Sequence, residues 1–114
     1  MQIDAVEFSE SVLRVKCSGP FGIGSAGNPS GRLLNQSIER WITTHPGERV
    51  KQIDIDYADV DYTWGDGPLW SIVPFILQGI IKIRLIGGSQ NGKSLENLVR
   101  TSGLPWVVVE RRDA

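Results

Sequence analysis

The feature that most constrains this fold is a repeated change in the spacing of the apolar residues. At residues 13–17 and again at residues 53–57, apolar and polar residues alternate, which is the two-residue period of a β-strand with one buried face. Between these segments, Leu34, Ile38 and Ile42 recur at a spacing of four, which is typical of an amphipathic helix. A chain that alternates strands and helices in this way is expected to adopt an α/β fold.

Turn and cap residues divide the pattern into eight elements in the order β-β-α-β-α-β-α-β. This order over residues 1–114 predicts one domain with a mostly parallel central sheet, right-handed crossovers and helices packed against the sheet in a three-layered scaffold. The expected strands lie at residues 3–8, 13–17, 51–57, 81–85 and 106–110, and the helices lie between Ser30 and Pro46, between Asp66 and Gln78, and around Leu95 up to Gly103.

The second helix is expected to lie deep in the core, because its apolar residues point nearly all round the helix. Asp66 is expected to act as its N-cap, and Pro68 can occupy the first turn, where a missing N–H does no harm. Trp41 and Trp70 lie at core spacings and are expected to be buried. Trp64 lies in a glycine-rich loop and is either an interface anchor or a lid that folds back over the sheet.

Composition excludes several classes of function. Twelve basic and thirteen acidic residues leave a net charge of −1, which provides no electrostatic footprint for nucleic acid. Cys17 is the single cysteine, so no internal disulfide can form, and a reducing, cytoplasmic location is expected. The N-terminus lacks the pattern of a signal peptide, and the most apolar stretch, residues 68–86, has too many polar breaks to span a membrane.

The histidine, the cysteine and the carboxylates form no pattern that indicates catalysis or a metal site. His45 is the only histidine, and no serine or cysteine can be paired with it in a catalytic triad on sequence grounds. We therefore expect no enzyme activity, no cofactor and no bound metal. An acidic cluster near the third strand lacks the glycine and the distal glutamate of a calcium loop. Its members are Asp54, Asp56, Asp59, Asp61 and Asp66.

The element order and two segments of the chain resemble the STAS family, whose best-known members are bacterial anti-sigma-factor antagonists. Members commonly read aspartate, an apolar run and then Asp-Ser-Ser/Thr-Gly opening a helix, and here residues 56–67 read DYADVDYTWGDG. Residues 94–104, SLENLVRTSGL, are similar to the last helix of the family. The resemblance covers nearly the whole chain in layout, with few identities. It implies a protein partner of the serine-kinase or anti-sigma-factor type.

The chain departs from the family pattern at its regulatory serine. In the family a kinase phosphorylates that serine and the added charge releases the partner. Here Trp64 stands at the aspartate and Gly65 at the serine, so phosphate cannot be accepted there. Asp66, at the next position, is either a plain N-cap or a permanent mimic of the phosphorylated state, and we favour the cap. The expected partner-binding residues are Asp61, Thr63, Trp64, Gly65, Asp66 and Gly67.

A second motif supports an alternative function. Residues 87–94, GGSQNGKS, satisfy the phosphate-loop pattern between an expected strand and an expected helix. In that interpretation Gly87 and Gly92 let the backbone N–H groups surround a phosphate. Lys93 would contact the outer phosphate oxygens, and Ser94 would bind magnesium. Only about twenty residues follow, too few for the later strands that a nucleotide hydrolase needs. The alternatives are therefore weak phosphate or nucleotide binding, and a glycine-rich turn that needs no ligand.

Overall fold

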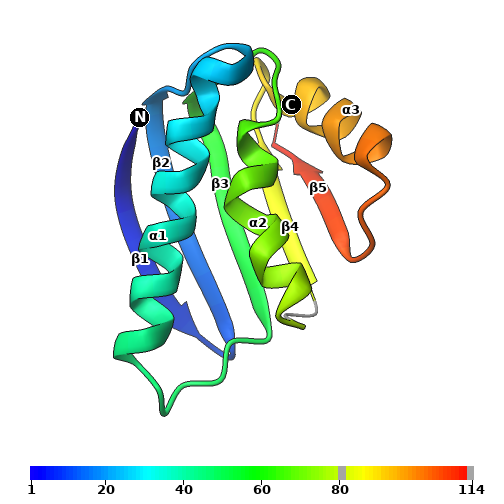
Figure 1. The fold of residues 1–114 in the computed structure, drawn as a ribbon. Helices are drawn as coiled ribbons and strands as arrows, with labels where there is room; N and C mark the ends of the chain where they lie inside the picture. Colours follow the sequence, from blue (N-terminus) through cyan, green and yellow to red (C-terminus); the bar gives the residue numbers. More distant parts are fainter. Residues whose placement is uncertain (80–81, 113–114) are drawn as a thin grey trace.

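The computed structural model describes residues 1–79 and 82–112, which contain five strands, three α-helices and a short 3₁₀ helix (Figure 1). The predicted order β-β-α-β-α-β-α-β is confirmed. The 3₁₀ helix was not predicted, and Ile81, expected to begin the fourth strand, lies outside the described residues. The elements are β1 (Gln2–Ser9), β2 (Val12–Pro20), η1 (Gly24–Gly27), α1 (Asn28–Thr44), β3 (Gln52–Asp61), α2 (Gly67–Leu77), β4 (Lys82–Gly87), α3 (Gly92–Ser102) and β5 (Val107–Arg111).

The strands form one sheet in the order β1-β2-β3-β4-β5. β1 and β2 pair antiparallel, and the other three pairings are parallel, so the prediction of a mostly parallel sheet is confirmed. Glu10 and Ser11 turn the first hairpin with φ values of 52° and 66°. Positive φ at both central residues is the turn geometry whose twist suits a two-residue hairpin.

All three helices lie on one face of the sheet (Figure 1). Each parallel connection moves one strand further in the same direction, and a right-handed crossover then places its helix on the same side every time. The prediction of three layers was wrong, because the described residues form two layers, a sheet and a helical layer. The side chains that line the hollow on the other face of the sheet are mostly charged.

The hydrophobic core lies between these two layers. Ile53, Ile55 and Tyr57 of β3 point into it, as their alternation predicted, and Leu34 and Ile38 of α1 cover them. All five side chains are fully buried. The described helices include none that is long and apolar enough to cross a membrane.

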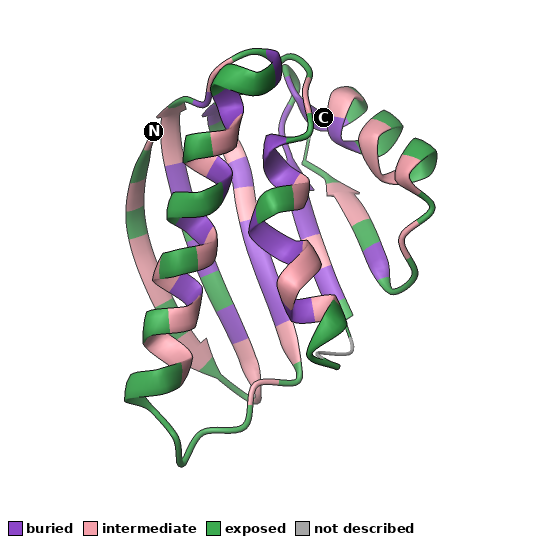
Figure 2. Ribbon diagram, viewed as in Figure 1, coloured by how far each residue is buried: buried purple, intermediate pink, exposed green. Residues whose placement is uncertain are grey.

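The second helix departs from prediction. Ile72 and Phe75 of α2 are buried, but Trp70 is 48% exposed and Leu77 is 81% exposed. Figure 2 shows buried, intermediate and exposed stretches along this helix. A helix that is apolar all round is buried on every side only if another layer covers it. In this two-layered fold none of the described elements lies outside α2. The predictions that α2 lies deep in the core and that Trp70 is buried were therefore wrong, while Trp41 is partly buried against the core.

Candidate functional site

The loop between β3 and α2 follows the carboxyl end of a parallel strand, and it is firmly held. The Tyr62 hydroxyl donates a hydrogen bond to the Gly65 carbonyl at 2.7 Å. The Gly24 amide donates to the Trp64 carbonyl at 3.1 Å, which joins the loop to η1. Burial raises the pKa of Tyr62 to about 12, and the nearby charge of Asp66 adds to that rise. The loop is thus an ordered platform for its exposed side chains.

The structure brings most of the predicted partner-binding residues to the surface. Asp61, Thr63, Trp64 and Asp66 are exposed, and Trp64, at 61% exposed, does not serve as a lid over the core. Gly67 is buried, and a Cβ there would meet the Phe21 ring and the Gly27 backbone. Gly67 therefore serves close packing beneath the site.

Asp66 does not cap α2 with its side chain. It stands at the N-cap position with φ −88° and ψ 2°, and its carboxylate accepts no capping hydrogen bond. An N-cap residue usually has extended backbone angles, which direct its side chain to the first free N–H groups of the helix. Within residues 1–79 and 82–112 the carboxylate has no hydrogen bond or ion pair. The capping prediction was wrong, and a charged group stays available at the surface.

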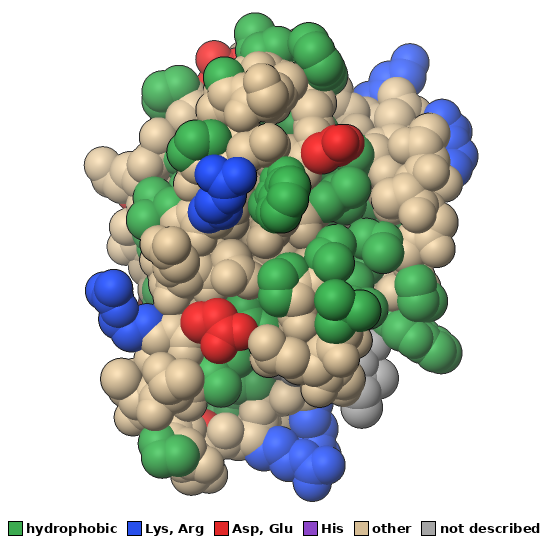
Figure 3. All heavy atoms as spheres, in the orientation of Figure 1, with side chains coloured by type: hydrophobic (Ala, Val, Ile, Leu, Met, Phe, Trp, Pro, Cys, Tyr) green, Lys and Arg blue, Asp and Glu red, His purple; other side chains and the backbone are tan. Residues whose placement is uncertain are grey.

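An apolar surface extends from this loop along the outside of α2 (Figure 3). We call it the α2 surface. Hollows of 330, 310 and 210 Å³ border it, and Trp64 and Trp70 form the walls between them. Among the described residues that line these three hollows, Asp66 is the one with a charged side chain. The residues of the α2 surface are Trp64, Leu69, Trp70, Val73, Pro74 and Leu77.

The segment that matches a phosphate loop is closed by one of its own side chains. Asn91 is fully buried, and its Oδ1 accepts a hydrogen bond from the Gly88 amide at 2.9 Å. Its Nδ2 donates to the carbonyls of Tyr57 and Val60 at 2.6 and 2.7 Å. The Asn91 side chain therefore accepts the hydrogen bond of one backbone N–H of the loop, and its own N–H groups link the β4–α3 turn to the end of β3.

Close packing explains the loop glycines without any ligand. A Cβ on Gly87 would come within 2.5 Å of the Gly92 Cα, and a Cβ on Gly92 would meet the Arg111 side chain at 2.7 Å. Lys93 is exposed and Ser94 is partly buried beside the Trp64 loop. This geometry favours the interpretation as a glycine-rich turn over the interpretation as a phosphate site.

We expect no nucleotide binding at this turn. Titration with magnesium ATP or GTP to millimolar concentration should give no saturable change in tryptophan fluorescence, because Asn91 already occupies part of the loop that would cradle phosphate. The Lys93→Ala variant should behave as the wild type does. A micromolar affinity that this substitution abolishes would contradict the expectation.

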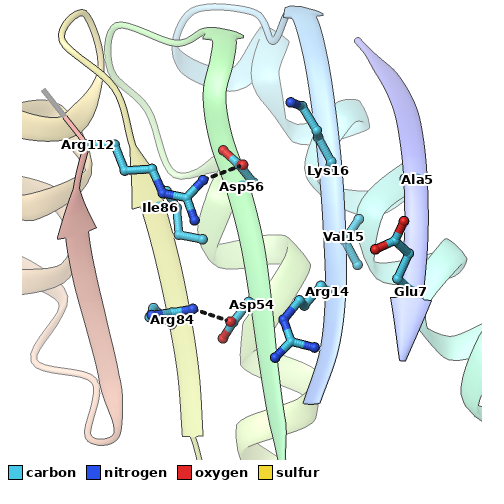
Figure 4. A pocket seen from close by; sticks show the side chains of 10 residues that line it. All are labelled: Ala5, Glu7, Arg14, Val15, Lys16, Asp54, Asp56, Arg84, Ile86 and Arg112. Atoms are coloured by element: carbon cyan, nitrogen blue, oxygen red, sulfur yellow. Dashed lines mark hydrogen bonds and ion pairs between the residues drawn. The ribbon is translucent and has the colours of Figure 1, made fainter. Parts of the chain in front are cut away.

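The face of the sheet opposite the helices carries a hollow of 220 Å³ that is lined mostly by charged side chains (Figure 4). Arg84 pairs with Asp54 at 2.6 Å and with Glu110 at 3.0 Å, and Arg112 pairs with Asp56 at 3.2 Å. Asp54 and Asp56 lie on the polar side of β3, as predicted, and both carboxylates are taken by guanidinium groups. No group of three or more potential metal-ligating side chains occurs in the part of the chain that the structure describes. We interpret this face as a set of ion pairs between neighbouring strands, which makes the uncovered side of the sheet polar and suited to contact with water.

One of these pairs should contribute measurably to stability. Arg84→Met should lower the free energy of unfolding by about 2 kcal/mol, because it leaves the Asp54 carboxylate, 3% exposed, without its cation. Arg112→Met, which removes a guanidinium group that is itself half-exposed, is the matched control and should change stability by less than about 0.5 kcal/mol. Urea denaturation measures both. Adding Asp54→Leu to Arg84→Met should recover most of the loss, and no recovery would contradict this account.

The remaining candidates have structural roles. His45 follows the end of α1, where its ring stacks on Trp41 with centroids 4.1 Å apart and its Nδ1 lies 2.7 Å from the Trp41 carbonyl. Cys17 is buried in the core, and burial raises the pKa of its thiol to about 12. Neither group is placed for chemistry.

The sequence-based predictions missed two features of this region. Asn91 was treated as a variable position of a motif, although an asparagine before a helix in a tight turn is a known hydrogen-bonding signal. No local pattern in the sequence indicated that Trp70 would be exposed.

A scan against models of known protein families finds none that matches this chain, and a search of curated proteins finds no similar sequence. The STAS resemblance therefore depends on element order and on the residues quoted above.

Proposed function

We propose that this chain is a regulatory domain that binds another protein, in the manner of anti-sigma-factor antagonists of the STAS family. The observation that carries the proposal is the α2 surface, where Trp64, Trp70 and Leu77 are 61%, 48% and 81% exposed on one side of the molecule. A contiguous apolar surface is unfavourable in water, and such surfaces commonly mark protein contacts. Exposed tryptophans are favoured as anchors because they bury a large area at little entropic cost.

The partner in this proposal is a cytoplasmic protein of the serine-kinase or anti-sigma-factor type. Gly65 has no hydroxyl to phosphorylate, and Asp66 carries its charge permanently, so binding is not switched by phosphorylation at position 65. The partner surface must instead be matched to a constant negative charge. We propose no catalytic role, because the described titratable side chains lie in ion pairs, in the core or at the open surface.

Site-specific photocrosslinking in the native cells tests this function. A benzophenone amino acid at position 77, on the α2 surface, should give a crosslinked product with a second protein. The same amino acid at position 14, exposed on the opposite face of the sheet, is the matched control and should give none. A product from position 14 without one from position 77 would contradict the proposal.

A charge on the α2 surface should also abolish the crosslink. Val73→Asp places a carboxylate where the partner would bury apolar area, and it should reduce the crosslinked yield from position 77 at least about tenfold. Thermal unfolding of the variant checks that the domain is still folded. An unchanged yield from a folded variant would exclude this surface as the contact.

A further inference from the structure

Two tryptophans and a carboxylate meet at the largest hollow that borders the α2 surface. Trp64, Trp70 and Asp66 line its 330 Å³, together with small residues of η1 and the start of α1. The two indole rings come from different elements, the β3–α2 loop and α2 itself. Trp64 is held by the hydrogen bond between its carbonyl and the Gly24 amide, and its ring lies against Gly24. The Trp64 wall of the hollow is therefore held in place by η1.

These groups share one chemical preference. The face of an indole ring attracts cations, and a carboxylate attracts the same ligands. Asp66 has no hydrogen bond or ion pair of its own among the described residues, and it is the charged residue of the hollow. Arg32 already lies over the Trp70 ring, 5.4 Å from its centroid, without forming an ion pair with Asp66. The Trp70 ring thus accepts a guanidinium group within this chain, and the Asp66 charge remains unused.

From this arrangement we infer that the hollow between Trp64 and Trp70 binds an arginine or lysine side chain of the partner protein. The surroundings favour a protein side chain over a free organic cation. Asp66 and Trp70 also line the neighbouring hollow of 310 Å³, whose other residues, Leu69, Val73 and Pro74, are apolar. A ligand that fills both hollows must present a cation next to an apolar group, as a peptide with adjacent basic and aliphatic residues does. The inference rests on the proposed function and names the chemistry of its partner.

The indole N–H signals of the four tryptophans test this assignment in the isolated chain. Titration with acetyl-Leu-Arg-amide should shift the signals of Trp64 and Trp70 and leave those of Trp41 and Trp106 in place. Acetyl-Leu-Gln-amide, which keeps the aliphatic residue and lacks the cation, should bind at least about fivefold more weakly. Tetramethylammonium chloride at equal concentration tests a free organic cation.

Asp66→Asn keeps the shape of the side chain and removes its charge, so it should weaken the arginine peptide about fivefold or more without moving the affinity of the glutamine peptide. Asp61→Asn changes an exposed carboxylate at the end of β3, just before the loop, that does not line the hollow. This variant is the matched control and should leave both affinities unchanged. Equal binding of both peptides to wild type, or an Asp66→Asn variant that binds arginine as tightly as wild type, would overturn the inference. Tighter binding of tetramethylammonium than of the peptide would overturn its assignment to a protein side chain.

The outcome is separable from that of the proposed function. Crosslinking from position 77 depends on the apolar side of α2, whereas Asp66→Asn alters the cation site alone. If the crosslink forms and Asp66→Asn leaves arginine binding intact, the domain still binds a protein and the cation site is wrong. If the crosslink is absent, the proposed function fails whatever the peptides do.

Discussion

Asn91→Asp should lower the free energy of unfolding by about 4 kcal/mol, although it changes one side-chain nitrogen to oxygen. The new oxygen would face the carbonyls of Tyr57 and Val60 at the 2.6 and 2.7 Å where Nδ2 now donates. Two hydrogen bonds are lost and a carboxylate is enclosed in a fully buried site. Urea denaturation at pH 7 measures the loss. Asn97→Asp, on the exposed side of α3, is the matched control and should change stability by less than about 0.5 kcal/mol.

The loss should also depend on pH. Burial and the two facing carbonyls would raise the pKa of the introduced aspartate above its usual value of about 3.9. A raised pKa in the folded state means that the folded protein binds the proton more tightly, so the variant recovers stability as pH falls towards 4. Its deficit relative to wild type should therefore be smaller at pH 4 than at pH 8. A deficit that does not change with pH, or one below about 1 kcal/mol, would show that Asn91 does not fasten the turn as described.

Gly31→Ala should destabilise the domain by about 3 kcal/mol. A Cβ at this position would lie 2.0 Å from the Gly67 carbonyl oxygen and 3.0 Å from the Trp70 Cβ, so α1 and α2 must move apart. In the interior of a helix, replacing glycine by alanine is ordinarily favourable by about 1 kcal/mol, so the sign of the effect identifies the close approach. Chemical denaturation gives its size, and the fluorescence of Trp70 should change with the displacement of α2.

Gly47→Ala is the matched control for that substitution. Gly47 lies in the turn after α1, and apart from its chain neighbours no atom of the described residues lies within 4 Å of a Cβ built there, so this variant should be neutral. A Gly31→Ala protein as stable as the Gly47→Ala protein would mean that the two helices do not approach as closely as described. The α2 surface would then lose the support that positions Trp70.

The local sequence pattern was sufficient to predict the order of the helices and strands and to predict which side chains of β3 face the core. The alternation of Ile53, Ile55 and Tyr57 predicts both the strand and the direction of its buried side chains, because neighbouring side chains in a strand always point to opposite faces. Gly103 was likewise expected to close the last helix, and it does so with φ 65°. The same reasoning failed for Asp66, because the residue type favours a cap while the backbone at that position directs the carboxylate elsewhere.

The amino-acid sequence by itself determined the order and type of the elements and the excess of apolar residues on α2. These features depend on residues that lie only a few positions apart in the chain. Tertiary structure decided which of those residues meet water. Strand order and crossover handedness place the three helices on one side of the sheet, so no element of the described residues covers the outside of α2. Trp64, Trp70 and Asp66 therefore converge on one hollow at the surface. Contacts between distant segments, such as Asn91 with Tyr57, leave no periodic signal in the chain, because they form only when the strands are assembled.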